Sequence, residues 1–298
     1  MAPIHLAQLV LLAALWGASF LFMRVATPEF GPVALIAIRV TIAALFLLPV
    51  WWLREGRKRA SVWQSQWPHL LVVGALNSAI PFVLFAYSTL SITGGLASIL
   101  NSTAPLWAAL VAYLWLREPL SSGRVAGMVL GLGGVAILVS DTTGGAVTGA
   151  PQGIAAALAA TLLYGIAANY TVQKLRSVSS LTIATFSLVA ATILLALPVL
   201  FFIPTDAISK QAWLAVLAMG LLSTGVANIL YFHLIASVGA TRAITVTFLI
   251  PIFGTLFGAV FLQEPVTTGI IIGTIVILFG TALVTGVLKL PVTERAGD

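Results

Sequence analysis

The sequence predicts an all-α membrane protein in which ten transmembrane helices form two inverted five-helix repeats. Hydrophobic residues make up 60% of the 298 residues and charged residues only 7%, whereas a soluble domain carries roughly a quarter charged residues. Apolar runs of about 20 residues, long enough to cross a bilayer, recur from end to end. Barrel strands would alternate apolar and polar residues, and no such alternation is present.

Internal repetition is the second observation. Pro105 is matched by Pro251, 146 positions later, and Leu-Arg-Glu-Pro at 116–119 is matched by Leu-Gln-Glu-Pro at 262–265. Further matches are Gly123 with Gly269, Gly127 with Gly273, and Trp16-Gly17 with Tyr164-Gly165. Duplication within a hydrophobic chain is typical of secondary transporters, whose substrate sites lie between the repeats.

Proline, glycine and charged clusters divide the apolar pattern into elements. The breaks lie at 27–32, 54–59, 91–93, 118–119, 141–151, 174–180, 204–210, 239–240 and 264–265. We expect helices over 4–26, 32–53, 68–90, 94–116, 122–140, 151–173, 181–203, 211–236, 241–262 and 267–288. The glycine-rich segment 141–150 is the expected linker between a first repeat at 4–140 and a second at 151–288.

The distribution of basic residues predicts the orientation. Because five is odd, the second repeat enters the membrane in the opposite sense. With the N-terminus in the cytoplasm, eleven of the fourteen Lys and Arg fall on the inner side: Arg54, Arg57, Lys58, Arg59, Arg117, Arg124, Lys174, Arg176, Arg242, Lys289 and Arg295. This asymmetry predicts two cytoplasmic termini and makes the net charge of +6 a topology signal rather than a nucleic-acid signal.

These features resemble a known family. Trp16-Gly17-Ala18-Ser19-Phe20, the intramembrane Arg39, and the repeated proline, Glu-Pro and glycine pattern are similar to the EamA-type members of the drug/metabolite transporter superfamily. The resemblance covers about residues 5 to 288, and within the family it is nearest to the YddG-type exporters of aromatic amino acids. It implies a multi-pass exporter of amino acids, other metabolites or drugs in the bacterial inner membrane.

Acidic residues are absent from the middle of every predicted span, which bears on the substrate. A membrane-embedded carboxylate would typically bind a cationic drug or a proton, and all eight acids lie in loops, at helix ends or near the C-terminus. Neutral or zwitterionic substrates, moving by facilitated diffusion or exchange, fit better. A multidrug exporter and a lipid-carrier flippase on the same fold remain the alternatives.

Eight residues are candidates for substrate binding, and each has a plainer alternative. Arg39 either binds a substrate carboxylate or caps helix ends and pairs with backbone carbonyls, the role that the resemblance favours. The amides can instead hold helices together, His233 can be an interfacial polar tip, and the aromatic rings can face lipid. The candidates are Trp16, Arg39, Asn77, Tyr87, Asn101, Tyr164, Asn228 and His233. By contrast, Trp51, Trp52, Trp63 and Trp67 flank the basic inner segment and are expected in an interface belt.

Several function classes are disfavoured. The chain has no cysteine and no HExxH motif, and no acid in mid-span is available for catalysis at membrane depth. We therefore expect no enzyme, no cofactor, no metal site and no nucleic-acid partner, only a small-molecule substrate and the lipid bilayer. Small-residue spacings such as Gly254/Gly258 permit either helix packing within a monomer or a homodimer.

Overall fold

The computed structural model describes residues 2–143 and 150–288, and every regular element that it assigns there is a helix. Eight helical segments are long and apolar enough to cross a membrane: Pro3–Phe30, Pro32–Gly56, Ser65–Ser88, Gly94–Leu116, Ser122–Asp141, Ala150–Lys174, Ser180–Phe201 and Lys210–Val238. Two shorter apolar helices, Val246–Leu262 and Thr268–Val284, follow them. The predicted all-helical membrane class is confirmed.

The first half of the chain follows the predicted spans, with irregular turns inserted. Its elements are α1 (Pro3–Phe30), α2 (Pro32–Trp51), η1 (Trp52–Gly56), α3 (Arg57–Gly74), η2 (Ala75–Ala79), α4 (Ile80–Ser88), α5 (Gly94–Asn101), α6 (Ala104–Leu116) and α7 (Ser122–Thr143). The breaks predicted at 27–32 and 54–59 are wrong in part. Pro28 lies inside α1, which ends only where Gly31 adopts φ 71°, and residues 54–59 are helical because Arg and Lys are good helix formers whatever their charge.

The second half also follows the predicted spans to within a few residues. Its elements are α8 (Ala150–Lys174), α9 (Ser180–Ala196), η3 (Pro198–Phe201), α10 (Lys210–Gly220), η4 (Leu221–Val226), α11 (Ala227–Val238), α12 (Ala240–Ala243), α13 (Val246–Leu262) and α14 (Thr268–Val284). Three of these helices have a hydroxyl side chain at the N-cap. Ser179, Ser209 and Thr267 accept hydrogen bonds from backbone N–H groups in the first turns of α9, α10 and α14. Residues 144–149 of the expected linker lie outside the described residues.

Irregular backbone occurs at matching places in the two halves. The π-helical segment η2 begins at Ala75 and η4 begins at Leu221, the same 146-residue offset that relates Pro105 to Pro251. Arg117 and Gln263, which share that offset, are the two non-glycine residues with positive φ in the described ranges, at 56° and 55°. π-turns inside helices are often found at functional sites, because the extra residue re-aims the side chains around it.

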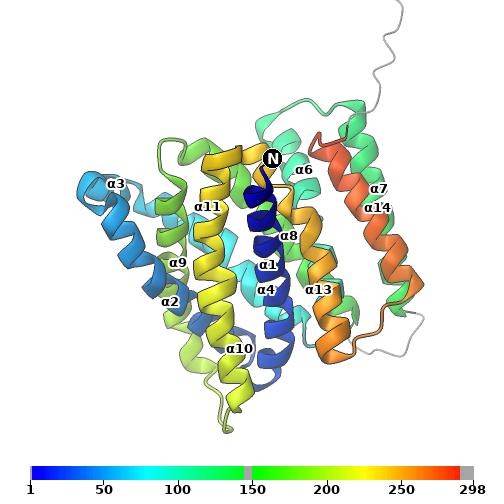
Figure 1. Ribbon diagram of the computed structural model, residues 1–298, viewed down its shortest axis with the longest axis horizontal. Coiled ribbons are helices and arrows are strands. Elements are labelled where there is room, and N and C mark those ends of the chain that lie inside the picture. The colour runs from blue at the N-terminus through cyan, green and yellow to red at the C-terminus, as the bar shows by residue number, and fades with distance from the viewer. Residues whose placement is uncertain (1, 144–149, 289–298) are drawn as a thin grey trace, which may run out of the picture.

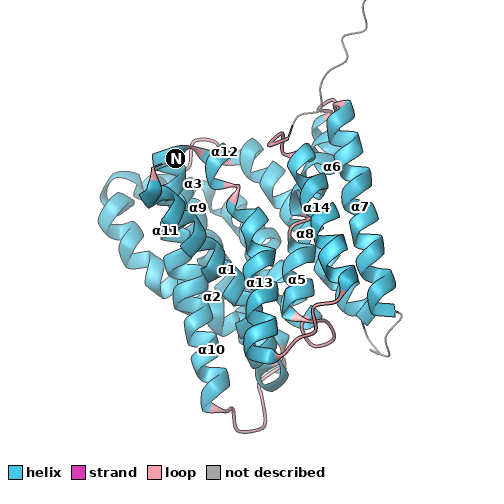
Figure 2. Cartoon of the chain, turned by 45° about the vertical axis from the view of Figure 1, so that its right-hand side comes forward, coloured by secondary structure: helices cyan, strands magenta, loops and turns pink. Residues whose placement is uncertain are grey.

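The described ends of the chain lie at one end of the helix bundle, and the two Glu-Pro turns lie at opposite ends (Figure 1). In Figure 1, the N-terminal end of α1 and the C-terminal end of α14 lie at the same, upper end of the bundle. The connection from α6 to α7 is also at this end, whereas the connection from α13 to α14 is at the lower end. Figure 2 shows α13 between α1 and α5, and all three are in contact.

The glycine spacings are used for packing within the chain. A Cβ atom on Gly127 of α7 would come 2.6 Å from the carbonyl oxygen of Gly280 on α14, and one on Gly17 of α1 would come 2.6 Å from Cβ of Phe253 on α13. Only glycine allows these backbones to approach so closely. Gly254 and Gly258 also pack within the chain, where added Cβ atoms would meet Ser98 and Glu264 respectively.

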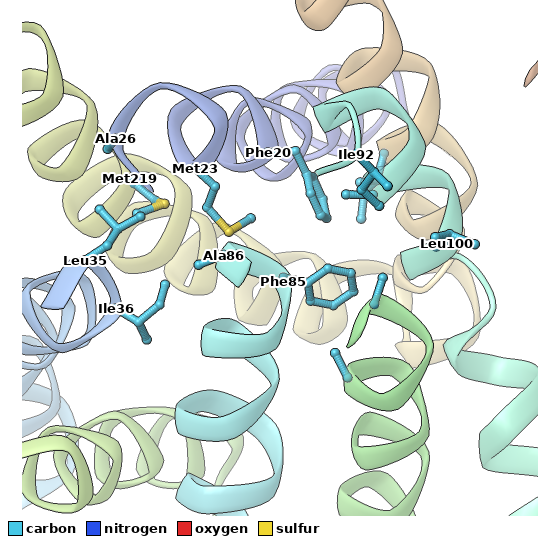
Figure 3. Close-up of a cluster of buried hydrophobic side chains, with 14 of the residues drawn as sticks. Phe20, Met23, Ala26, Leu35, Ile36, Phe85, Ala86, Ile92, Leu100 and Met219 are labelled. Carbon is cyan, nitrogen blue, oxygen red and sulfur yellow. The ribbon is translucent and has the colours of Figure 1, made fainter. Parts of the chain in front are cut away.

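A continuous apolar core joins α1, α2, α4 and α10. Figure 3 shows part of it, with Met23, Leu35, Ile36, Ala86 and Met219 among the labelled side chains. Phe20 and Phe85 belong to the same cluster, and their rings meet edge to face at 5.6 Å. The core therefore continues into the space between the two halves.

Candidate functional site

A cavity with a volume of about 600 Å³ lies between helices from both halves. It is lined by side chains from α1, α2, η2, α4, α5, α6, α7, α8, α9, η4, α11, α13 and α14. Glu118, Arg124 and Thr285 line it at the upper end of Figure 1, where α6 turns into α7. A concave, mostly apolar space with a few polar groups is the usual form of a small-molecule site.

Polar side chains of the two π-helical segments, η2 and η4, line this cavity. Asn77 and Ser78 of η2, and Ser223 and Thr224 of η4, all line it. The Thr224 hydroxyl donates to the carbonyl oxygen of Met219 at 2.9 Å, five residues earlier, as the wider π-turn allows. Asn77 was a candidate from the sequence, but Ser78 and Thr224 were not, although these two polar residues lie 146 positions apart, as do Asn77 and Ser223.

Arg39 is buried beside the cavity, with 5% of its surface exposed. Its Nε–H donates to the Thr224 hydroxyl at 3.0 Å, and the Phe82 ring lies 4.0 Å from the guanidinium carbon. The backbone-carbonyl pairing considered from sequence is not what the structure shows, since its recorded partner is a side-chain hydroxyl. Across residues 2–143 and 150–288, no carboxylate forms an ion pair with this guanidinium.

Aromatic rings from both halves line the same space. Trp16 on α1 lies 5.1 Å from the ring of Tyr231, and Tyr164 on α8 stacks on Phe85 at 6.0 Å. Trp16 and Tyr164 occupy matching sequence positions, and both face the cavity. A flat apolar group placed here would meet a ring contributed by each half.

The amide candidates also reach the cavity, whereas two of the eight candidates do not. Asn77, Asn101 and Asn228 line it, and Asn228 Nδ2 donates to the carbonyl oxygen of Thr224 at 2.7 Å. Tyr87 is 45% exposed and His233 is exposed as well, and neither belongs to the lining. The structure thus brings together Trp16, Arg39, Asn77, Asn101, Tyr164 and Asn228.

At the lower end of the bundle, polar contacts join α1, α5 and α13. The Glu264 carboxylate accepts hydrogen bonds from the backbone N–H groups of Gly94 at 2.9 Å and Gly95 at 3.1 Å. Arg24 Nε lies 3.8 Å from the same carboxylate, and Arg24 Nη1 donates to the carbonyl oxygen of Thr89 at 2.7 Å. These contacts tie the two halves together at the end opposite Glu118.

Comparison with known proteins supplies the family. The model of the EamA-like transporter family matches residues 5–140 and again residues 151–286. The chain belongs to the EamA-like transporter family. It is therefore a multi-pass membrane transporter, and this EamA-like chain acts on small molecules in a lipid bilayer.

Curated relatives cover nearly the whole chain. The chain is 26% identical over 281 residues to the uncharacterized transporter YvbV of Bacillus subtilis, covering 93% of this chain and 90% of the relative. It is 28% identical over 305 residues to protein PagO of Salmonella typhimurium, covering 100% and 98%. A probable terminal-alkyne amino-acid exporter of Streptantibioticus cattleyicolor is 24% identical, covering 86% and 84%.

A solved structure supports the fold. Its chain, described only as the crystal structure of a protein, superposes with a TM-score of 0.67 at 23% identity and covers 98% of this EamA-like chain and 99% of its own. At this identity the likeness concerns the fold alone.

Proposed function

We propose that this protein is an alternating-access exporter of small neutral or zwitterionic metabolites, with amino acids, including aromatic ones, as its main substrates. The observation that carries the proposal is the composition of the cavity. It combines the rings of Trp16 and Tyr164, three amide side chains and the buried Arg39. Among the described lining residues Glu118 is the one carboxylate, and it is exposed in the turn between α6 and α7, so the buried part of the lining offers no anionic anchor for a cationic drug.

The proposed transport cycle uses the two halves as inverted five-helix repeats. Repeats of this kind adopt two nearly interchangeable arrangements around a central site. The proposal is supported by the double match to the family model and by the matching π-turns η2 and η4. With both termini in the cytoplasm of an inner-membrane protein, the cavity described above opens inward and the contacts around Glu264 close the outer side.

Substrate recognition is proposed to divide between rings and polar groups. The rings of Trp16, Phe85 and Tyr164 exclude water from an apolar side chain, while Asn77 and Asn228 accept or donate hydrogen bonds. The preference for aromatic amino acids rests on the sequence resemblance to YddG-type exporters. One distant relative named as an amino-acid exporter is consistent with the broader substrate class.

A competition binding screen tests this function. The purified full-length protein would be incubated with a radiolabelled aromatic amino acid and challenged with three groups of competitors: unlabelled amino acids, cationic dyes and lipid-carrier headgroups. We expect amino acids with apolar side chains to compete most strongly. Competition by dyes alone would favour a multidrug exporter, and competition by headgroups alone would favour a lipid-carrier flippase.

A further inference from the structure

We propose that the guanidinium of Arg39 is a subsite for a carboxylate group of the substrate, with the Ser223 hydroxyl as an additional donor. The inference rests on the proposed function of the cavity as the path of a small metabolite. It goes further by naming the chemical group that a substrate must carry and the residue that selects it.

The charge of Arg39 is not balanced by a neighbouring carboxylate among the described residues. Removing an ion from water is costly unless an opposite charge or several hydrogen bonds compensate. Arg39 is 5% exposed, and among the described residues it has one hydrogen bond, to Thr224, one aromatic neighbour, Phe82, and no carboxylate partner. An anionic ligand group entering the cavity would supply the missing compensation.

The guanidinium of Arg39 has the geometry to bind a carboxylate. Arginine has five N–H donors in a planar fork, and its two terminal nitrogens bind both oxygens of a carboxylate at once. Nε–H is occupied by Thr224, and Phe82 packs on one face of the plane. Within residues 2–143 and 150–288 the two terminal nitrogens form no hydrogen bond, so the fork itself is available to a ligand.

A buried hydroxyl provides an independent observation. Among the described residues the Oγ atom of Ser223 has no hydrogen-bond partner, and Ser223 is 1% exposed and lines the cavity. It precedes Thr224, the residue that holds Arg39, on the same π-turn. Ser19 Oγ, on the α1 side of the cavity, is also buried and unpartnered. Unsatisfied buried hydroxyls are costly, and a ligand oxygen would satisfy them.

Hydrogen bonds around Thr224 fix the position of the Arg39 guanidinium. The Thr224 hydroxyl accepts a hydrogen bond from Arg39 Nε–H and donates one to the carbonyl oxygen of Met219. Asn228 Nδ2 donates a hydrogen bond to the carbonyl oxygen of Thr224. This chain of bonds connects Arg39 of the first half to η4 of the second. A carboxylate bound there would leave the apolar part of the ligand directed into a cavity lined by rings.

Binding measurements on matched ligands test the proposal in the wild-type protein. Phenylalanine and 3-phenylpropionate carry a carboxylate, whereas phenylalaninamide and 3-phenylpropanol do not. We expect the carboxylates to bind at least about 10-fold more tightly than their uncharged or amide counterparts, as hydrogen bonds to a charged group predict. Equal affinities within each pair, or no binding of either carboxylate, would overturn the proposal.

Variants assign the preference to Arg39. Arg39→Gln should reduce the affinity ratio within each pair to about one, and Arg39→Lys should retain only part of it, because an ammonium keeps the charge but not the fork. Arg176→Gln, which alters an exposed arginine at the end of α8, is the matched control and should leave the ratio unchanged. An unchanged ratio in Arg39→Gln would refute the assignment.

Two further measurements distinguish failure of the carboxylate subsite from failure of the proposed amino-acid function. If Arg39→Gln fails to fold, Thr224→Val removes the Nε partner and should lower the same ratio, and a Thr224→Val ratio equal to wild type would count against the subsite. If amino acids do not bind but 3-phenylpropionate binds in an Arg39-dependent way, the proposed amino-acid function fails while the carboxylate subsite stands. If Arg39→Gln transports amino acids as the wild type does, the proposed amino-acid function stands and the carboxylate subsite fails.

Discussion

Glu118 and Glu264 occupy matching positions in the two halves but have opposite environments. Each follows a residue with left-handed backbone, and each backbone N–H bonds to the carbonyl oxygen six residues earlier, that of Ala112 or Gly258. The Glu264 side chain is 9% exposed and bonds to α5, whereas Glu118 is exposed and lines the cavity. The two matching carboxylates therefore differ in their contacts, because only that of Glu264 joins the two halves.

Breaking the contacts of Glu264 should favour opening of the outer side, which they close in the proposed cycle. Glu264→Gln removes the charge that faces Arg24 and weakens two charge-assisted bonds to Gly94 and Gly95. Because the chain has no cysteine, a single Ser19→Cys substitution reports access to the cavity. We expect a membrane-impermeant thiol reagent added outside to label Cys at this position about 5- to 30-fold faster, the equivalent of roughly 1–2 kcal/mol. Glu118→Gln is the control, and equal labelling rates in the two variants would refute the role of Glu264.

Close packing of α7 on α14 should make Gly127 intolerant of larger residues. Gly127→Val places a side chain against the Gly280 carbonyl and the side chains of Leu283 and Val284, which should cost about 1–3 kcal/mol. A lower midpoint of thermal unfolding in detergent, followed by size-exclusion fluorescence, measures this loss. Gly133→Ala on the same helix is the matched control, because nothing lies within 4 Å of a Cβ atom there. Similar midpoints for the two variants would contradict the packing described.

The rings that line the cavity should matter for transport more than for folding. Trp16→Ala or Tyr164→Ala should reduce transport of an aromatic amino acid about 10-fold while membrane insertion persists, because each removes a ring that contacts the substrate. Trp52→Ala changes an exposed ring outside the lining and should have little effect. Initial rates in proteoliposomes compare the three. Loss of transport in Trp52→Ala alone would place the site elsewhere.

Much of the helical architecture could be predicted from the sequence, because long apolar runs and proline or glycine breaks are local signals. Local charge misled the prediction at 54–59, where basic residues continue the helix beyond Trp51. Trp51 itself was assigned to an interface belt, but it is buried, its Nε1–H donates to the Thr182 hydroxyl at 2.8 Å, and its ring meets Phe186 edge to face. Which face of a helix a side chain occupies depends on the neighbouring helix, and the neighbour is not visible in sequence.

The candidate site could also be predicted from the sequence only in part. Symmetry between the halves selected Trp16 and Tyr164, and polarity inside a span selected Arg39 and Asn228, and all four line the cavity. The partner of Arg39, Thr224, was not selected, because a π-turn places it and a single threonine in an apolar span is common. Tyr87 and His233 have the right chemistry but lie outside the lining.

Reporter fusions test the proposed orientation of the two halves. A reporter after Gly56 should be cytoplasmic, and one after Gly144, which lies outside the described residues, should be on the other side of the membrane. The expectation follows from the basic residues of the predicted inner segments and from five spans per repeat. The same compartment for both reporters would rule out inversion of the second repeat.

Counterflow in proteoliposomes containing the purified protein shows whether it carries an aromatic amino acid through one alternating site. Vesicles loaded with an unlabelled aromatic amino acid should take up the labelled amino acid transiently, with saturation and without an imposed gradient, because an alternating site exchanges substrate in both directions. Collapse of a pH gradient should leave this exchange intact, since no acid lies in the interior of the cavity. Uptake no greater than in protein-free vesicles, or uptake that strictly requires the pH gradient, would contradict the account.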